Sequence, residues 1–108
     1  MVEYNSLLNA AYYSLSDPTR RDILLRVAQQ ELPIKDIAQP YDMSFAAVAK
    51  HVAVLETACL VRKRKLGKQQ LVSASPETLA LVTADLSKLE KVWNERFKAL
   101  DELLESTK

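Results

Sequence analysis

The strongest chemical signal in the sequence is a cluster of cationic side chains in its second half. Residues 50–70 carry six Lys or Arg and one carboxylate, and five of these cations fall within residues 62–68. The rest of the chain is slightly acidic, so the net charge of the whole is only +1. A local basic patch on a nearly neutral protein is typical of contact with phosphate groups. On charge alone, a hairpin kept soluble by its lysines is an equally good explanation.

Other kinds of chemistry have little support in the residue types present. One cysteine and one histidine cannot form a four-ligand zinc site within a single chain. A single glycine excludes a glycine-rich phosphate loop, and no Cys–His pair has a third group to orient it, which argues against an enzyme. No apolar run is long enough to cross a membrane, and no signal peptide is evident. We therefore expect a cytoplasmic protein of one domain, residues 1–108, with no cofactor, no metal and no membrane partner.

The elements that must position the basic cluster begin with helices. Apolar residues at helical spacing predict a first helix over residues 1–15. Asp17 can cap a second helix, with Pro18 at the first position, where its missing N–H costs nothing. A short third helix is expected to begin at Leu32-Pro33 and to be broken by Pro40. The second helix is expected to bury Ile23, Leu24, Val27 and Ala28 and to carry Arg20, Arg21 and Arg26 on its outer side.

A further helix is predicted immediately before the basic cluster. Ser44 can cap it, and its buried positions follow Val48 at i, i+4 and i+7 until about Thr57. With the short helix and the turn before it, this segment forms a predicted helix-turn-helix over residues 34–57. The outer face of the capped helix would carry Ala46, Ala47, Lys50 and His51.

Strand and helix signals complete the chain. Two short runs flank Gly67-Lys68 and predict a two-residue β-hairpin over residues 60–74. From Pro76 to about Ser106 no further glycine or proline occurs, which predicts a helix of roughly 46 Å. Its apolar stripe is longer than the preceding residues can cover, so we expect a second copy of the chain to cover the remainder. The alternative is a helix that wraps wholly around its own core.

In this order, the elements and motifs resemble the ArsR-type family of winged helix-turn-helix transcriptional regulators. The most specific stretches are LSDPTRRDIL at residues 15–24 and YDMSFAAVAKHVAVLETACLVRKRKLGKQQLVSASPE at residues 41–77. The resemblance implies a mainly α-helical winged helix-turn-helix fold with a small β-hairpin, the wing, at residues 60–74. It also implies a homodimer, with helices 1–15 and 76–106 in the interface. Its function would be that of a dimeric repressor of transcription that binds a specific double-stranded DNA operator.

The resemblance also assigns roles to individual positions. The helix that begins at Ser44 would enter the major groove of DNA, and the wing would lie along the flanking backbone. The residues expected at DNA are Ser44, Ala46, Ala47, Lys50, His51, Arg62, Arg64, Lys65, Lys68, Gln69 and Gln70. The residues expected in the dimer interface are Tyr4, Leu8, Tyr12, Leu86, Leu89, Trp93, Phe97 and Leu100.

Three positions depart from the family's pattern. Ala49 stands where the family usually has Ser, and Phe45 is bulkier than expected and could face either DNA or the core. Cys59 replaces a usual Gly at a helix C-terminus, where a left-handed residue is common. Either that helix ends differently here, or Cys59 tolerates some backbone strain, with a reactive thiol as a third possibility.

Sensing is not specified by the sequence. The short-helix region has no Cys or His and the terminal helix has no His, so the family's metal-sensing residues are missing. The resemblance therefore implies a metal-independent member, whose small-molecule effector, if one exists, is unknown. The alternative function is a winged-helix module that binds a protein partner and not specific DNA.

Overall fold

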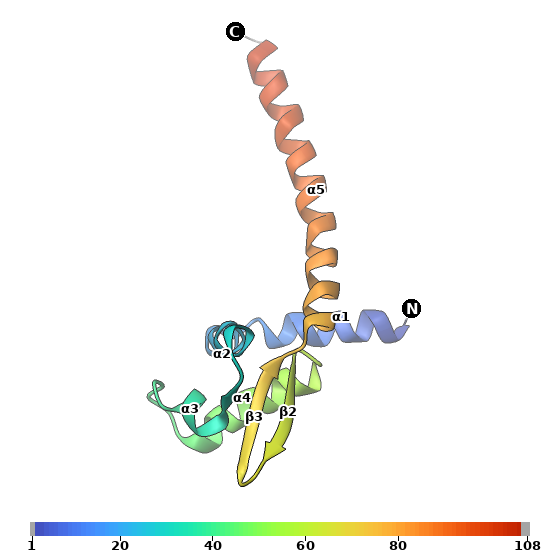
Figure 1. The fold of residues 1–108 in the computed structure, drawn as a ribbon. Coiled ribbons are helices and arrows are strands. Elements are labelled where there is room, and N and C mark those ends of the chain that lie inside the picture. Colours follow the sequence, from blue (N-terminus) through green and yellow to red (C-terminus); the bar gives the residue numbers. More distant parts are fainter. Residues whose placement is uncertain (1, 107–108) are drawn as a thin grey trace.

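The computed structural model describes residues 2–106 and is mainly helical with one small sheet. The body is formed by the four N-terminal helices and the sheet, and the long C-terminal helix projects from it (Figure 1). The helices are α1 (Val2–Ser14), α2 (Pro18–Gln29), α3 (Ile34–Ala38), α4 (Phe45–Thr57) and α5 (Pro76–Ser106). The strands are β1 (Leu32–Pro33), β2 (Val61–Leu66) and β3 (Gln69–Ala74).

Two predicted N-caps set the starts of α2 and α4. The Asp17 carboxylate accepts a hydrogen bond from the backbone N–H of Arg20 at 3.0 Å, and Pro18 occupies the first helical position. The Ser44 hydroxyl accepts from the N–H of Ala47 at 3.1 Å. Each cap satisfies one of the N–H groups that a helix start leaves without a partner. Both cap predictions are confirmed.

The sheet has three antiparallel strands in the order β1-β3-β2, of which only two were predicted. The β2–β3 hairpin is confirmed, with Gly67 at a φ of +62° in its turn. The expectation that Leu32-Pro33 starts a helix is wrong: these two residues pair with Val72 and Leu71 of β3. Two residues carry no detectable periodicity, and a proline is tolerated on an edge strand because its missing donor can face outward.

The core lies where α2, α3 and α4 pack on the sheet. Ile37, Val48, Val52 and Leu55 are fully buried there, which confirms the predicted buried stripe of α4. The prediction fails at Ala28, which is exposed. Ala28 lies a rotation of about 100° beyond the buried Val27, at the border of the stripe in the last turn of α2.

The arginines of α2 are also more engaged than predicted. Arg20 is half-buried and donates to the carbonyl of Ser14 at 2.7 Å, at the C-terminal end of α1. Arg26 is half-buried as well and donates to the carbonyl of Ile37 at 2.8 Å, in α3. Helix ends leave carbonyls without intrahelical donors, and these guanidinium groups satisfy them. Both arginines therefore join α2 to its neighbours and do not simply face solvent.

The backbone at the C-terminal end of α4 shows how this helix ends at Cys59, where the family usually has Gly. Its φ is +61°, in the left-handed region that favours glycine. The N–H of Cys59 donates to the carbonyl of Glu56 at 2.9 Å, and the N–H of Leu60 donates to Leu55 at 3.0 Å. This pair of bonds is a Schellman motif. The helix therefore ends in the manner that suits glycine, and Cys59 tolerates the backbone strain.

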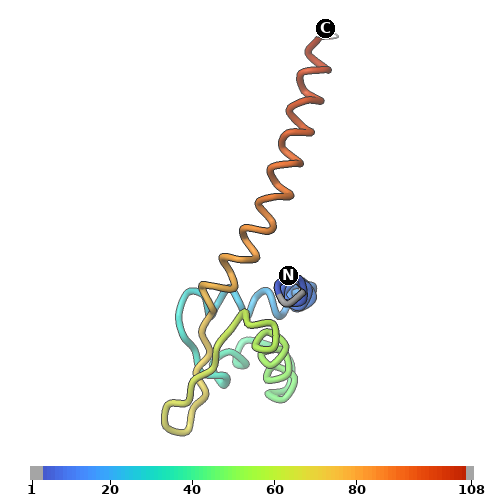
Figure 2. Tube along the Cα trace, turned by 90° about the vertical axis from the view of Figure 1, so that its right-hand side faces the viewer, coloured from blue at the N-terminus to red at the C-terminus, as the bar shows by residue number. Residues whose placement is uncertain are grey.

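The C-terminal helix leaves the body after its first turns, as Figure 2 shows from the side. Thr78 and Val82 are buried, and the Tyr12 hydroxyl donates to the Asp85 carboxylate. That bond raises the pKa of Tyr12 to about 12. The radius of gyration is 18.4 Å, against about 13 Å for a compact domain of this length. The alternative in which α5 wraps wholly around the core of its own chain is therefore excluded. No helix within residues 2–106 combines the length and apolarity that crossing a membrane requires.

Candidate nucleic-acid interface

The outer face of α4 carries the small side chains and the lysine that the sequence placed there. Ala46 and Lys50 are exposed and Ala47 is half-buried. Lys50 has no ion-pair partner among residues 2–106. The Ser44 hydroxyl is exposed and occupied as a cap acceptor, but its own O–H is still available to donate. This face therefore combines small side chains, one hydroxyl and one lysine that is unpaired within the described part of the chain.

His51 lies apart from this face and points toward the start of α2. Its Nδ1 atom accepts from the Arg20 guanidinium at 3.3 Å and is 3.9 Å from the Asp17 carboxylate. The backbone N–H of Arg20 is the main reason that the pKa of Asp17 is lowered, with a smaller contribution from His51. The half-buried His51 ring therefore helps to hold α4 against the α1–α2 junction through its Nδ1 atom.

The cations of the wing fall into two groups. At its base, three of them pair with carboxylates of the same chain. The Arg64 guanidinium donates to both oxygens of Glu31, at 2.9 and 2.7 Å. Arg62 pairs with Glu77, and Lys63 pairs with Glu56 at 3.2 Å. At the tip, Lys65 and Lys68 have no ion-pair partner within the described part of the chain.

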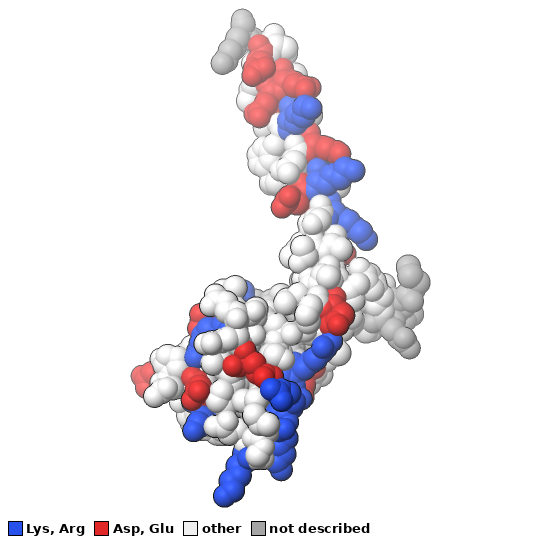
Figure 3. All heavy atoms as spheres, in the orientation of Figure 1, with Lys and Arg blue, Asp and Glu red and all other residues white. Residues whose placement is uncertain are grey.

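Neighbouring groups shift the pKa values of two of the paired carboxylates. The hydrogen bonds from Arg64 lower the pKa of Glu31, and the same contact raises the pKa of Arg64. The pKa of Glu77 is lowered chiefly by its own backbone N–H and by the Ser75 hydroxyl. Exposed pairs of this kind contribute little to stability, but they neutralise half of the cations predicted to meet phosphate. Figure 3 shows Lys and Arg gathered along the hairpin at the lower end of the molecule.

A cleft of about 280 Å³ separates α4 from the wing tip. Phe45 stands on the α4 side, and its side chain is 56% exposed. Of the two orientations that the sequence left open, the one toward the core is therefore excluded. We refer to this hollow as the wing cleft; its lining residues are Pro33, Ile34, Lys35, Phe45, Lys68, Gln69 and Gln70.

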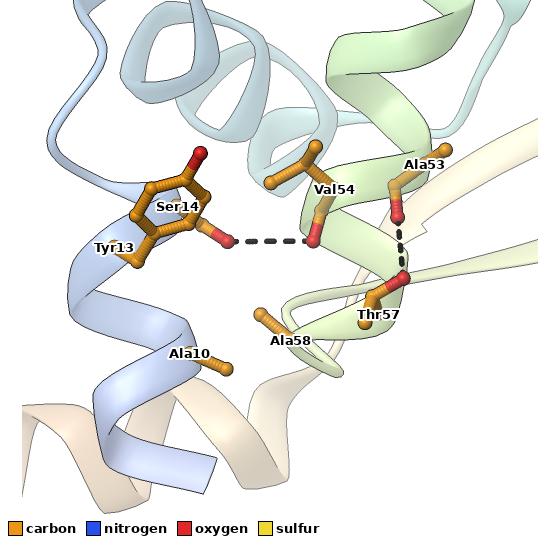
Figure 4. Close-up of a pocket in the computed structure, with 7 residues that line it drawn as sticks. All are labelled: Ala10, Tyr13, Ser14, Ala53, Val54, Thr57 and Ala58. Atoms are coloured by element: carbon orange, nitrogen blue, oxygen red, sulfur yellow. Dashed lines mark hydrogen bonds between the residues drawn. The ribbon is translucent and has the colours of Figure 1, made fainter. Parts of the chain in front are cut away.

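A second hollow of similar size lies between α1 and α4 (Figure 4). Two of its three hydroxyl groups are engaged within the chain: Ser14 donates to the Val54 carbonyl at 3.3 Å, and Thr57 donates to the Ala53 carbonyl at 3.0 Å. Alanine side chains form much of its remaining surface. It therefore offers mostly apolar surface to a ligand.

The remaining predicted site is the apolar face of α5. Its five predicted interface residues are 47–65% exposed, and the Trp93 and Phe97 rings meet edge to face with centroids 5.0 Å apart. On α1, Tyr4 and Tyr12 are half-buried against the core. Leu8 is only 7% exposed, because it packs in the core of its own chain and leaves little surface for a partner. The five exposed residues are Leu86, Leu89, Trp93, Phe97 and Leu100.

Metal ligands are not clustered in this structure. Among the side chains that the structure describes, those of residues 4–106, no group of three or more His, Cys, Asp or Glu is arranged to hold a metal ion. Cys59 is exposed at the end of α4, and His51 is engaged with Arg20.

Comparison with known proteins assigns the family. No family model matches the chain. The HTH-type transcriptional regulator Rv2034 of Mycobacterium tuberculosis is 32% identical over 96 residues, which cover 89% of this chain and 87% of that protein. The crystal structure of the ArsR family transcriptional regulator RHA00566 superposes with a TM-score of 0.75 at 29% identity, over 83% of this chain and 93% of that one.

A third similar protein shows the same fold at lower identity. The homodimeric winged helix-turn-helix DNA-binding domain of Mb0332 from Mycobacterium bovis superposes with a TM-score of 0.68 at 21% identity, over 83% of each chain. The fold, the order of the elements and the relative that is 32% identical agree with one another. The chain is a member of the ArsR family of winged helix-turn-helix transcriptional regulators.

Proposed function

We propose that the protein is a metal-independent homodimeric repressor that binds a specific double-stranded DNA operator. The observation that carries this proposal is the position of the free cations. Lys50 lies on the outer face of α4 and Lys65 and Lys68 at the wing tip, and none has an ion-pair partner within residues 2–106. Figure 1 places α4 and the hairpin at the end of the molecule opposite the C-terminus of α5.

The chemistry of α4 suits the major groove. The small Ala46 and Ala47 side chains permit close approach to base edges, and a lysine at Lys50 can donate to guanine O6 and N7. The Ser44 hydroxyl, which accepts the cap bond, retains a proton that it can donate to a phosphate oxygen. These groups would supply the sequence-dependent part of the binding free energy.

The chemistry of the wing suits the backbone. Lys65 and Lys68 would neutralise phosphates, with Gln69 and Gln70 as neighbouring hydrogen-bond donors. Arg62 and Arg64 would act mainly through their own carboxylate partners, by holding the base of the wing against α5 and the α2–β1 connection. Phosphate contact by these two arginines would first have to break those pairs.

The dimer follows from the apolar face of α5. Leu89, Trp93 and Phe97 are exposed along a helix that projects from the body, a surface that usually marks an interaction site. The homodimeric domain from Mycobacterium bovis has the same fold, which supports a second copy as the partner. A two-fold dimer would present two α4 helices to two half-sites separated by a whole number of DNA turns.

Repression and metal independence complete the proposal. The described residues form one winged helix-turn-helix domain, and we propose that it represses by occupying its operator. The side chains described, those of residues 4–106, offer no clustered ligand set, and we propose that DNA binding does not respond to metal.

A DNA titration tests the proposed function. Duplexes selected from a random library would be titrated by fluorescence anisotropy at several salt concentrations, beside an unselected duplex. We expect preference for the selected duplex and an affinity that falls steeply with salt. Equal, weak binding to both duplexes would contradict the proposal and would favour the alternative module that binds protein.

A further inference from the structure

Phe45 is an exposed aromatic residue at a position where the proposed function places DNA. It is the first residue of α4, and more than half of its side chain is accessible. Its neighbour Met43 is also partly exposed, whereas Val48 in the next turn is fully buried. An aromatic side chain left in water forgoes a large gain in free energy from burial. The described part of the chain therefore leaves the Phe45 ring accessible to a ligand.

The surroundings of Phe45 define what such a ligand must be. In the wing cleft, Pro33, Ile34 and Phe45 supply apolar surface. Lys35 and Lys68 line the same cleft, and neither has an ion-pair partner within residues 2–106. An apolar wall beside two free cations is complementary to a molecule that carries an apolar group next to negative charge.

The position of Phe45 on α4 indicates which part of a bound DNA duplex would lie near its ring. Successive helical residues are rotated by about 100°, so Phe45 lies beside Ala46 on the flank of the outer face. Because the wing cleft joins Phe45 to Lys68 and Gln69, this flank is the one nearest the wing. If α4 lies in the major groove and the wing contacts the flanking backbone, one DNA strand passes along this cleft. This step rests on the proposed function.

Thymine supplies the apolar group that fits this location. Its C5-methyl is the apolar feature that base pairs present in the major groove, and phenylalanine is among the side chains that contact it. The phosphates of the same strand would lie near Lys35 and Lys68. We propose that Phe45 packs against the C5-methyl of one thymine in each half-site and thereby determines part of the operator's sequence.

Deoxyuridine provides the sharpest test, because it lacks only this methyl and pairs as thymine does. Each thymine of a duplex selected by the wild-type protein is replaced in turn by deoxyuridine, and the affinity is measured at constant salt. We expect about a fourfold loss at one position of each half-site, the loss that corresponds to one buried methyl group. The remaining substitutions should change the affinity by less than twofold.

Protein variants assign the lost contact to Phe45. The Phe45→Ala variant should bind the thymine duplex more weakly than the wild type does, and it should bind the thymine and deoxyuridine duplexes with equal affinity. The four affinities of the two proteins for the two duplexes form a double-mutant cycle. Phe45→Leu should keep part of the discrimination. Leu25→Ala is the matched control, because Leu25 is similarly exposed but lies on α2, and it should discriminate as the wild type does.

The outcomes separate this inference from the proposed function. If no deoxyuridine substitution weakens wild-type binding, or if Phe45→Ala discriminates as strongly as the wild type, the thymine contact is refuted. In that case a selected duplex that is still preferred over a random one leaves the proposed function intact. If no duplex is preferred at all, both the proposed function and the thymine contact fail.

Discussion

The two ends of the molecule expose surfaces of different chemistry, and each surface suits a different kind of partner. Beyond its first turns, α5 presents exposed apolar residues such as Trp93 and Phe97. At the other end, α4 and the wing tip present Lys50, Lys65 and Lys68 without ion-pair partners in the described chain. The apolar end can gain free energy by excluding water against a second apolar surface, whereas the cationic end gains by meeting phosphate. Under the proposed function, the apolar end would serve dimerisation and the cationic end would serve DNA recognition.

The largest expected effect is at the apolar end. Trp93→Glu places a carboxylate in the proposed interface, where an unpaired buried charge costs about 3 kcal/mol or more, so dimerisation should weaken by more than a hundredfold. Sedimentation equilibrium measures the change. Glu95→Lys is the control, because Glu95 lies on the opposite side of the helix and should leave association unchanged. A wild-type protein that is monomeric at micromolar concentration would contradict the assignment of the apolar end.

The next effect is at the outer face of α4. Lys50→Ala should weaken binding to a selected operator by about 1–3 kcal/mol per subunit if Lys50 contacts a base. Binding to random duplex should change much less, because that binding depends on phosphate contacts. Titration of both duplexes measures the difference, with Lys88→Ala on α5 as a control expected to alter neither affinity. Equal losses on both duplexes would show that Lys50 contacts only phosphate.

A smaller difference should distinguish the tip of the wing from its base. Replacing Lys65 and Lys68 with Ala should weaken specific and non-specific binding alike and reduce the log-log salt slope by about two units per subunit. The same change at Arg62 and Arg64 should reduce the slope less, because their carboxylate partners already neutralise them.

A charge-neutral control sharpens this comparison within the wing. Glu31→Gln combined with Arg64→Gln removes one ion pair without altering net charge, and DNA affinity should stay close to that of the wild type. Equal salt slopes for the lysine and arginine double variants would show that all four cations meet phosphate, as the sequence alone predicted.

The smallest effect concerns the body between the two ends. Cys59 has a left-handed backbone that costs most residues about 1–2 kcal/mol but glycine almost nothing. Cys59→Gly should therefore raise the free energy of unfolding by roughly 0.5–1 kcal/mol, after the extra entropy of glycine in the unfolded chain is allowed for. Urea denaturation measures this change, with Cys59→Ala as the control expected to bring no such gain. Dimerisation and DNA affinity should be unaffected, and a loss of either would connect this turn to one of the two ends.

Much of the fold could be predicted because its signals are local. Asp17 and Ser44 each accept a hydrogen bond from an N–H only three residues along the chain. Gly67 lies in the hairpin turn that it makes possible, and α5 extends without a break from Pro76 to Ser106. Strand β1 was missed because two residues have no period, and its pairing with β3 depends on a segment 40 positions along the chain.

The candidate site was predicted less completely than the fold. The sequence marked the basic cluster, and Lys50, Lys65 and Lys68 are indeed exposed. Arg62 and Arg64 differ from those lysines because they form ion pairs with residues 15 and 33 positions away in the sequence. No spacing rule predicts such pairs. His51 was assigned to the outer face by its helical position, but Arg20 and Asp17 hold it from a neighbouring helix.

Local sequence patterns were sufficient to predict the class of the fold, the approximate limits of its main helices, the position of the hairpin and the surplus of apolar surface on α5. These properties depend on residues within a few positions of one another, where capping, turn geometry and periodicity act. The packing of distant segments was needed to establish which cations lack an ion-pair partner in the described part of the chain, that Phe45 lines the wing cleft and not the core, and that Leu8 is buried in its own chain. The physical reason is that burial and charge pairing depend on which distant segments pack together, and that arrangement is a property of the whole chain.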